Sequence, residues 1–212
     1  MNLLVVAATQ AEIGPFIAHI GNNAYPSMRL NVLITGVGML ATSYALTKHL
    51  HGRRYDLVLQ VGVAGSYDTA IGLGEVVFVA SDRYGDLGAE DHDDYIDIFD
   101  MGLIDKNVSP HNDGKLLSAM SPVIHLPQVS GLTVNTVSGN ADTIKKRITR
   151  YNCQVESMEG AAFHYVCLRE GIAFAQVRSI SNYVTPRDKS QWKMKEAIIS
   201  LNNWLIDFIA KQ

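Results

Sequence analysis

The sequence is poor in cysteine and has no strong excess of charge of either sign. Of 212 residues only 2 are cysteines, Cys153 and Cys167, and their spacing is not that of a metal or redox pair. Lysine and arginine number 18 against 21 aspartate and glutamate residues, so the formal net charge is −3. Such a chain offers no basic surface, and no nucleic-acid partner is expected. The thiols suit a reducing compartment, where they serve as small buried hydrophobic groups.

The sequence also lacks a long hydrophobic run. The apolar segment at residues 3–8 is too short to span a membrane, and no basic stretch precedes it as in a signal peptide. We therefore expect a cytoplasmic protein with no membrane partner. Hydrophobic residues make up 47% of the chain, enough for one sizeable core, and no repeat or linker interrupts it. Residues 1–212 are predicted to form a single domain.

Apolar runs rich in valine, isoleucine and leucine recur along the chain and indicate strands covered on both faces. They lie at residues 3–8, 30–35, 56–63, 75–81, 132–137 and 173–180. Helical patterns lie between or after them, at residues 39–51, 141–151, 159–170 and 194–210. This order predicts an α/β fold, a three-layer αβα sandwich around a central mixed, mostly parallel twisted sheet.

Residues 83–127 do not follow this alternation. They are rich in loop signals and contain Pro110, Pro122 and Pro127. A long irregular segment in a compact domain is usually functional or disordered. We expect a surface excursion that closes over a site or meets a second subunit.

Polar residues gather where the predicted strands end, which is where ligands bind in an open α/β sheet. They are Glu12 after the first strand, Gly62–Ser66 after the third, Ser138–Asp142 after the fifth, Glu156 and Glu159 before a helix, and Arg178, Ser181 and Asn182 after the last. No Ser/His/Asp or Cys/His set accompanies them. The combination favours acid–base attack on a small polyol-bearing ligand over acyl transfer.

Several of these residues have a purely structural alternative. Glu12 suits a helix N-terminus through the helix dipole alone. Arg178, at the end of a buried strand, needs an anionic partner, which Glu12 or Glu159 would supply as a structural ion pair. Glu156 and Glu159 lie in the otherwise apolar stretch VESMEGAA and are harder to explain this way, because unpaired buried carboxylates are costly.

Two further motifs point only weakly to a ligand. The stretch TGVGMLA at residues 35–41 resembles a dinucleotide-binding turn, but it follows the second strand and its glycines equally suit a tight turn. The stretch EDHDDYID at residues 90–97 holds potential metal ligands, yet it lacks the glycine and the spacing of a calcium loop. A solvated acidic loop is the favoured interpretation, and we predict no metal ion and no cofactor.

The stretches SMEGAAFHYVC at residues 157–167 and GIAFAQVRSISN at residues 171–182 resemble the nucleoside phosphorylase/nucleosidase superfamily, specifically its nucleosidase branch. There a Met-Glu pair opens a helix and Arg-x-Ile-Ser-Asp ends a strand. A glutamate after the first strand and VGVAGS at residues 61–66 match the same pattern. The resemblance runs from Leu3 to about Trp192 and is weakest in the excursion.

The resemblance implies a role for each matched residue. Glu12 is the base that activates the attacking water, and Arg178 helps to order the water and the carboxylate. Glu159 binds the ribose 2′- and 3′-hydroxyls, and Met158 packs on the sugar. The other expected substrate contacts are Ala64, Gly65, Ser181, Thr143 and Arg187. The resemblance also implies a small-molecule nucleoside substrate and a homodimer or higher homo-oligomer.

Asn182 departs from the pattern, because adenine-specific members carry an aspartate there. The amide offers one donor, to O6 of a 6-oxopurine, and one acceptor, to a protonated N7, whereas adenine would leave the donor unpaired. The segment ISNYV, with Arg187 and Trp192 after it, resembles the futalosine hydrolases. Those enzymes release hypoxanthine from an inosine whose 5′ end carries a benzoate group. Arg187 and Lys189 are candidates to bind that group, and a solvated turn is their alternative.

Three other functions remain open. A 6-oxopurine nucleoside phosphorylase would need arginines around phosphate, and the carboxylate of Glu12 would repel that anion. An adenosine-type nucleosidase is disfavoured by Asn182 and by Asp142, which lies where that type places an aromatic residue near the base. A non-catalytic nucleoside-binding module would not need both Glu12 and Glu159.

Overall fold

The computed structural model describes residues 1–92, 94–118 and 124–212. Its strands are β1 (Asn2–Ala7), β2 (Arg29–Ile34), β3 (Leu57–Ser66), β4 (Val76–Tyr84), β5 (Gly88–Asp91), β6 (Asp94–Asp97), β7 (Leu116–Leu117), β8 (Gln128–Thr133), β9 (Val155–Ser157) and β10 (Phe174–Tyr183). Its helices are α1 (Gln10–Asn22), α2 (Met39–Leu50), α3 (Ala141–Tyr151), α4 (Gly160–Glu170) and α5 (Met194–Ala210), with a 3-10 turn η1 (Lys189–Gln191).

The main sheet is mixed and partly closed on itself. Its strand order is β10-β4-β8-β9-β3-β1-β2, and β7 adds to β4. Because β3 also pairs with β10, the strands β3, β10, β4, β8 and β9 form a closed ring. The pairs β1–β2, β1–β3, β3–β10, β4–β8 and β8–β9 are parallel, whereas β4–β10, β3–β9 and β4–β7 are antiparallel. The predicted mixed, mostly parallel sheet is confirmed.

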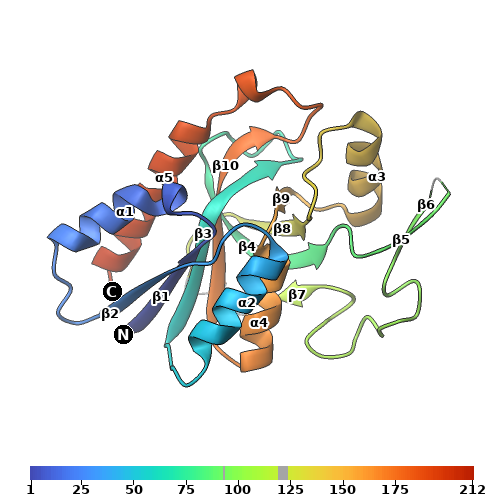
Figure 1. The fold of residues 1–212 in the computed structure, drawn as a ribbon. Helices are drawn as coiled ribbons and strands as arrows, with labels where there is room; N and C mark the ends of the chain where they lie inside the picture. The colour runs from blue at the N-terminus through green and yellow to red at the C-terminus, as the bar shows by residue number, and fades with distance from the viewer. Residues whose placement is uncertain (93, 119–123) are drawn as a thin grey trace.

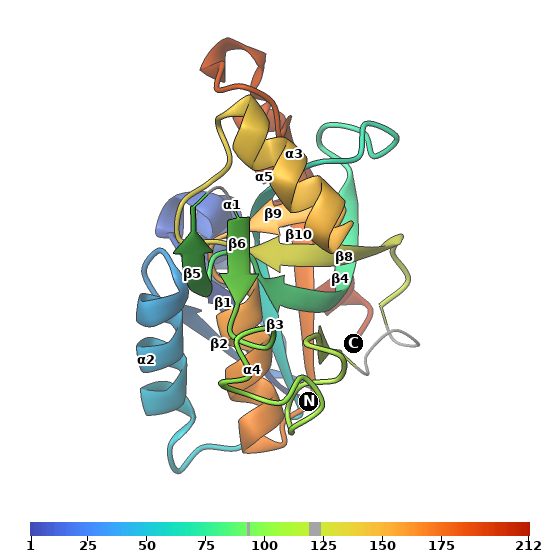
Figure 2. The ribbon, with the colours of Figure 1, turned by 90° about the vertical axis from the view of Figure 1, so that its right-hand side faces the viewer.

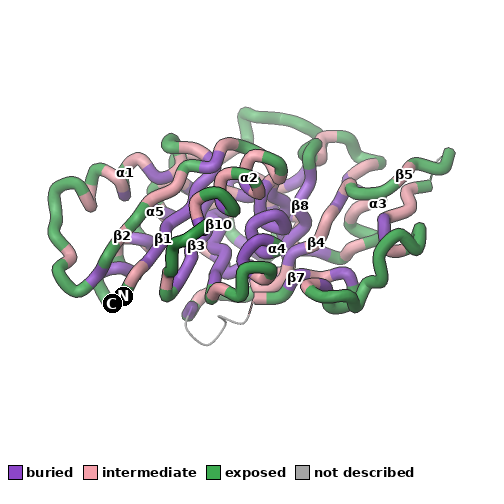
Figure 3. The backbone as a smooth tube through the Cα atoms, turned by 60° about the horizontal axis from the view of Figure 1, so that its bottom comes forward, coloured by how far each residue is buried: buried purple, intermediate pink, exposed green. Residues whose placement is uncertain are grey.

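Helices cover both faces of this sheet, with α1 and α5 on one side and α2 and α4 on the other (Figure 1). Strand β1 shows why the apolar runs are continuous. Leu3 and Val5 pack in the core beneath α1 and α5, while Leu4 and Val6 pack beneath α2 and α4. Burial is concentrated in the strands and in α4 (Figure 3). The three-layer αβα prediction is confirmed.

The excursion after β4 packs at one end of the sheet. Strands β5 and β6 form an antiparallel hairpin that lies beside α3 (Figure 2). Arg150 of α3 donates to the carbonyl oxygen of Tyr95 at 3.0 Å and pairs with Asp97 at 3.1 Å. Pro122 of the predicted excursion lies outside the described residues. In the described ranges, no helix has the length and apolar character that crossing a bilayer requires.

Several elements differ from their predicted bounds, and β3, β4 and β10 each end three residues beyond the predicted strands. The fifth strand was predicted at residues 132–137 but is β8, which ends at Thr133. It includes Gly131, where a Cβ atom would lie 2.8 Å from both Asp82 Oδ2 and Val79 Cγ1, so the glycine permits close strand packing. Helix α1 was not predicted; it contains Pro15 in its first turns and a non-helical Ile13.

Candidate active site

Glu12 joins the start of α1 to the middle of β3. Its Oε2 accepts hydrogen bonds from the backbone N–H and the hydroxyl of Thr9, at 3.0 and 2.9 Å. Its Oε1 accepts from the backbone N–H of Val63 at 3.1 Å. The two bonds from Thr9 belong to a helix capping box, so Glu12 does lie at a helix N-terminus, as its structural alternative requires. The bond from Val63 holds the other carboxylate oxygen against β3. The carboxylate is therefore fixed in direction while it stays partly exposed.

Arg178 is the largest fully buried side chain described, with 1% exposure. Its Nε donates to Gln176 Oε1 at 2.9 Å, and Nη2 donates to Gln60 Oε1 at 3.2 Å. Nη1 donates to the Val63 carbonyl at 3.3 Å. The anionic partner is Glu159, whose Oε2 lies 3.5 Å from both Nη1 and Nη2. Of the two partners considered from the sequence, the ion pair forms with Glu159.

Glu159 stands directly before α4 and is 5% exposed. Its Oε2 faces Arg178, and its Oε1 accepts from the backbone N–H of Gly38 at 3.0 Å. Gly38 has φ +92°, a conformation that favours glycine. The glycines of TGVGMLA thus make a turn that supplies a hydrogen-bond donor to this carboxylate. Two donor groups, one of them charged, offset the cost of burying Glu159.

Gly62 allows Glu12 and Arg178 to approach the same point of β3. A Cβ atom on Gly62 would lie 2.6 Å from Arg178 Nη1 and 2.8 Å from Glu12 Oε1. Any side chain there would displace one of these groups. A glycine inside a buried strand is the sequence signal for such a close approach. The residue was noted in the turn at the end of its strand, but its role in spacing the two charged groups emerges only from the structure.

Asn182 lies at the far end of β10, where the register against β3 shifts and Gly65 faces the asparagine. The amide Oδ1 accepts from Ser181 Oγ at 2.8 Å, and Nδ2 donates to the Tyr183 carbonyl at 3.1 Å. A Cβ atom on Gly65 would lie 3.2 Å from Asn182 Nδ2. The side chain of Asn182 is thus held against β3 by its own strand neighbours.

A cavity of about 70 Å³ opens beside this amide. Arg187 lies at its wall, with the guanidinium 5.3 Å from the ring centroid of Trp192 in a cation–π contact. Arg187 and Asn182 therefore line the same cavity. The lining residues are Gly65, Val137, Ser138, Glu156, Asn182, Tyr183, Val184, Thr185, Arg187 and Trp192. We call this space the Asn182 cavity.

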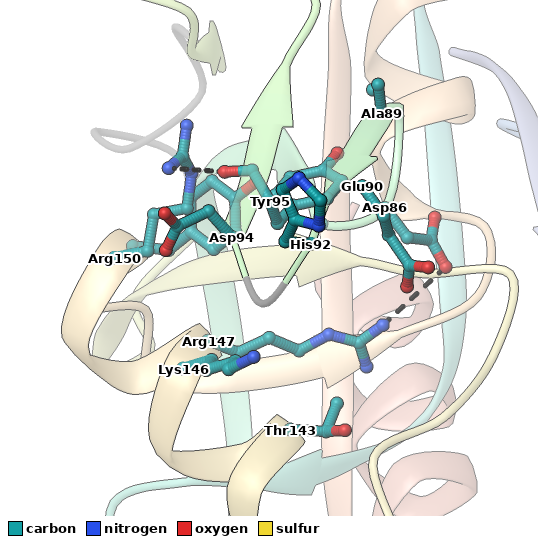
Figure 4. Close-up of a pocket in the computed structure, with 13 residues that line it drawn as sticks. Asp86, Ala89, Glu90, His92, Asp94, Tyr95, Thr143, Lys146, Arg147 and Arg150 are labelled. Atoms are coloured by element: carbon teal, nitrogen blue, oxygen red, sulfur yellow. Dashed lines mark hydrogen bonds and ion pairs between the residues drawn. The ribbon is translucent and has the colours of Figure 1, made fainter.

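The structure brings most of the predicted site residues to one edge of the sheet. Ala64 and Ser181 lie on β3 and β10, where Ser181 Oγ is 3.2 Å from the Ala64 carbonyl oxygen. Met158 is partly buried and directly precedes Glu159. Thr143 does not join them. It lies on α3 and lines a separate cavity of about 370 Å³ between α3 and the β5–β6 hairpin (Figure 4).

This second cavity is lined by Glu90, His92, Asp94 and Tyr95 of the stretch EDHDDYID. Basic side chains of α3 face the hairpin across it, and Arg147 lies 3.6 Å from Asp86 (Figure 4). Over the ranges that the structure describes, no three His, Cys, Asp or Glu residues come together as metal ligands would. Asp93 of the stretch lies outside those ranges. Asp97 of the stretch pairs with Arg150 of α3 instead, at 3.1 Å.

A buried polar network below Arg178 was not anticipated from the sequence. Asp82 accepts from Gln176 Nε2 at 2.9 Å and from Thr133 Oγ1 at 2.8 Å, and burial raises its pKa to about 6. Gln176 Nε2 also lies 3.0 Å from His164 Nε2, and burial lowers the pKa of that imidazole to about 4. The signal was a single aspartate at the end of the apolar run EVVFVASD.

The mixed sheet, with two carboxylates, an arginine and an amide at one edge, defines an α/β enzyme equipped for acid–base chemistry. Residues 23–210 match the sequence profile of the Phosphorylase superfamily. The chain belongs to that superfamily. The predicted family and the prediction that the chain is an enzyme are confirmed.

Relatives of known name are consistent with this assignment. The chain is 31% identical to a futalosine hydrolase of Thermus thermophilus, over 80% of this chain and 76% of that protein. It is 31% identical to a futalosine hydrolase of Acidothermus cellulolyticus, over 82% and 72% of the respective chains. Its fold resembles a 5′-methylthioadenosine/S-adenosylhomocysteine nucleosidase from Colwellia psychrerythraea, crystallised with adenine. The TM-score is 0.80 at 16% identity, over 100% of this chain and 95% of that one.

Proposed function

We propose that this protein hydrolyses the N-glycosidic bond of futalosine and releases hypoxanthine. The observation that carries the proposal is Asn182, held against β3 at the end of the strand that also carries Arg178. The two futalosine hydrolase relatives, each 31% identical, support the same substrate. An asparagine at this point suits a 6-oxopurine, because it presents both a donor and an acceptor to the ring.

The amide of Asn182 keeps enough hydrogen-bonding capacity to bind a base. Its NH2 group has two hydrogens, and one is donated to the Tyr183 carbonyl. The second is available for O6 of hypoxanthine. Its Oδ1 has two lone pairs, and one accepts from Ser181 Oγ. The other is available for N7–H of the leaving purine. Adenine would set its amino donor against the amide donor and leave both unpaired.

The proposed reaction breaks the bond between C1′ and the purine through an oxocarbenium-like transition state. Glu12 takes a proton from water, and the water oxygen attacks C1′. The electron pair of the C1′–N bond leaves with the purine, which takes up a proton at N7 from solvent. Glu159 accepts from the ribose 2′- and 3′-hydroxyls while Arg178 and the Gly38 amide hold its carboxylate in place.

The function is tested by incubating the protein with futalosine in phosphate-free buffer and measuring hypoxanthine. Aminofutalosine, inosine and methylthioadenosine are run in parallel. We expect release from futalosine without phosphate. Release that requires phosphate would make the protein a phosphorylase, and release only from the 6-amino compounds would contradict the reading of Asn182.

We also propose a homodimer or higher homo-oligomer. An exposed apolar stripe is formed by Val37, just before helix α2, and by Leu40 and Tyr44 on that helix, with exposed fractions of 55%, 86% and 67%. The stripe begins next to Gly38, whose amide binds Glu159. Large exposed apolar residues grouped close together in this way are typical of an interface. A second subunit on this face would lie beside the ribose-binding carboxylate.

A further inference from the structure

Glu156 is a buried carboxylate that the proposed reaction does not use. It lies on β9, is 5% exposed and lines the Asn182 cavity. Its Oε1 accepts from the backbone N–H of Ser138 at 2.8 Å. Its Oε2 accepts from Ser138 Oγ at 2.6 Å, from Arg147 Nη1 at 3.2 Å and from the Tyr67 hydroxyl. Four donors converge on one carboxylate beside the proposed base site.

Arg147 fastens the same backbone segment from the other side. Its Nη1 donates to the Thr136 carbonyl at 2.9 Å and to Ser138 Oγ at 2.7 Å. Asp86, 3.6 Å from Arg147, also accepts from the backbone N–H groups of Asn135 and Thr136 at 2.7 and 3.1 Å. Residues 134–140 form neither helix nor strand, so these side-chain bonds largely define their path. We call Tyr67, Asp86, Arg147 and Glu156 the anchor cluster.

The anchored segment is one wall of the Asn182 cavity. Val137 and Ser138 line that cavity together with Asn182. The next residue, Gly139, accepts from the backbone N–H of Arg187 at 3.2 Å, and a Cβ atom on Gly139 would touch the Arg187 side chain at 3.4 Å. The anchor cluster therefore sets the wall directly and sets the position of Arg187 through it.

The charges of the cluster make this wall rigid. The side chains of Arg147 and Glu156 are 11% and 4% exposed, so solvent screens their ion pair little. Burial, followed by the nearby Glu156, raises the pKa of the Tyr67 phenol, so its hydroxyl stays protonated and donates. Removing the charge of Glu156 would leave buried donors without an acceptor.

We infer that Glu156 is a positioning residue for purine selectivity, which holds Val137 and Ser138 at a fixed distance from Asn182. Asn182 distinguishes O6 from an amino group only while the purine is held in one position in the cavity. If residues 137 and 138 could move, a 6-amino purine could shift and avoid the donor-to-donor contact with the amide. This inference rests on the proposed function, because it takes the Asn182 cavity to hold the base.

Glu156→Gln tests the inference, because glutamine keeps the shape but cannot accept all four bonds. If the glutamine NH2 group takes the place of Oε1, it opposes the backbone N–H of Ser138. If it takes the place of Oε2, it opposes the guanidinium of Arg147. We expect KM for futalosine to rise about tenfold while kcat changes less than about threefold, and the kcat/KM preference for futalosine over aminofutalosine to fall about tenfold. Glu90→Gln, on the exposed hairpin, is the matched control and should change neither quantity.

Unchanged KM and unchanged preference in a folded Glu156→Gln protein would overturn the inference. If that variant does not fold, Tyr67→Phe decides, since it removes only one donor; it should move both quantities in the same direction by about threefold. No change in Tyr67→Phe would then overturn the inference.

Calorimetric binding of free hypoxanthine and adenine separates this test from the proposed reaction. A wild-type protein that binds hypoxanthine but does not cleave futalosine would contradict the proposed function. The inference would still require Glu156→Gln to weaken hypoxanthine binding and to lower the ratio of hypoxanthine affinity to adenine affinity. Equal binding of the two bases by the wild-type protein would contradict the inference itself.

Discussion

Glu12 and Glu159 are both carboxylates of the site, yet their surroundings differ. Glu159 is almost fully buried and pairs with Arg178, which compensates its charge. Glu12 is partly exposed and receives hydrogen bonds only from neutral donors. A base that takes a proton from water must contact that water, and its negative charge must not be neutralised by a cation. This difference supports Glu12 as the base and Glu159 as the group that binds the substrate.

We expect Glu12→Gln to lower kcat for futalosine hydrolysis by about 10²–10⁴, because the amide cannot take a proton from water. The substitution keeps the side-chain shape and an acceptor oxygen, so the protein should remain folded by circular dichroism. Glu170→Gln, at the exposed end of α4, is the control and should retain full activity. An unchanged rate in Glu12→Gln would rule out its role as base.

Gly62→Ala should be far more harmful than its size suggests. The new Cβ atom would lie 2.6 Å from Arg178 Nη1 and 2.8 Å from Glu12 Oε1, so one of these groups must move. A displacement of this order at a reacting group lowers the rate about 10²-fold. Gly21→Ala is the matched control, because nothing lies within 4 Å of its added methyl group. Steady-state kinetics of the two proteins should differ by that factor, and equal rates would contradict the geometry.

Asn182→Asp tests base recognition at a single atom. A carboxylate loses the amide donor for O6 and gains an acceptor for an amino group. We expect kcat/KM for futalosine to fall by about 10²-fold or more while that for aminofutalosine rises. The ratio of the two values, measured at one pH, is the readout. If the ratio keeps its wild-type value, Asn182 does not contact position 6 of the base.

At the scale of elements, the buried network around Asp82 connects strands to a helix. Thr133 of β8 donates to Asp82 of β4 and accepts from the Ala161 backbone N–H of α4 at 2.7 Å. Gln176 of β10 donates to Asp82 and accepts from Arg178. One carboxylate thus supports the end of α4 that follows Glu159 and the orientation of Arg178.

This network predicts a dependence of stability on pH. The pKa of Asp82 is raised to about 6 by burial, while an aspartate in the unfolded chain titrates near ~4. Between those values the folded protein keeps a proton that the unfolded chain has released, so the contribution of Asp82 to stability falls as pH rises through this window. Below pH ~4 and above pH ~6 that contribution is constant.

Asp82→Asn should remove this dependence. The free energy of unfolding of the wild-type protein minus that of Asp82→Asn should fall by on the order of 3 kcal/mol between pH ~4 and pH ~7. Urea unfolding at several pH values measures it. His164, whose pKa is lowered to about 4, makes a contribution of opposite sign, because its contribution to stability falls as pH falls through this range. It shares Gln176 with Asp82, so His164→Gln, alone and combined with Asp82→Asn, is measured alongside to separate the two contributions. A difference that does not vary with pH would contradict the assignment.

The elements that local patterns describe well were predicted well. Helix α3 has the predicted bounds, and α2, α4 and α5 begin and end within one residue of theirs. Helix α1 was missed because Gly14 and Pro15 weaken its pattern, and β8 was placed late because Gly131 looks like a turn. Glycine there serves contacts with another strand, and such contacts leave no local signature.

The site was predictable where a residue must be buried and charged, as with Arg178 and Glu159. It was not predictable where partners come from distant strands. The Gly62 contact joins three separate elements, and the link from Asp82 to Gln176 spans 94 positions of sequence. Thr143 follows a loop that lines the Asn182 cavity, but it lies on α3 and lines the separate cavity between α3 and the β5–β6 hairpin.

At the scale of the whole molecule, the apolar stripe on α2 predicts self-association. Leu40→Glu would bury a charge in the proposed interface, so the oligomer should dissociate to monomers and activity should fall with it. Light scattering after gel filtration measures the mass. Ile199→Glu, on α5 at the other face and 48% exposed, is the control and should leave the mass unchanged. A wild-type monomer would contradict the proposed oligomer.

The closed ring of β3, β10, β4, β8 and β9 also bears on how this protein avoids aggregation. Each strand of the ring has a paired neighbour on both sides, which leaves it less open to pairing with another chain than an edge strand. In the described parts of the main sheet, β2 is the one strand of more than two residues with a neighbour on a single side. Its first residue, Arg29, is exposed and charged, which discourages pairing with a second edge. A fibril that grew by strand addition to the main sheet would therefore start most readily at β2.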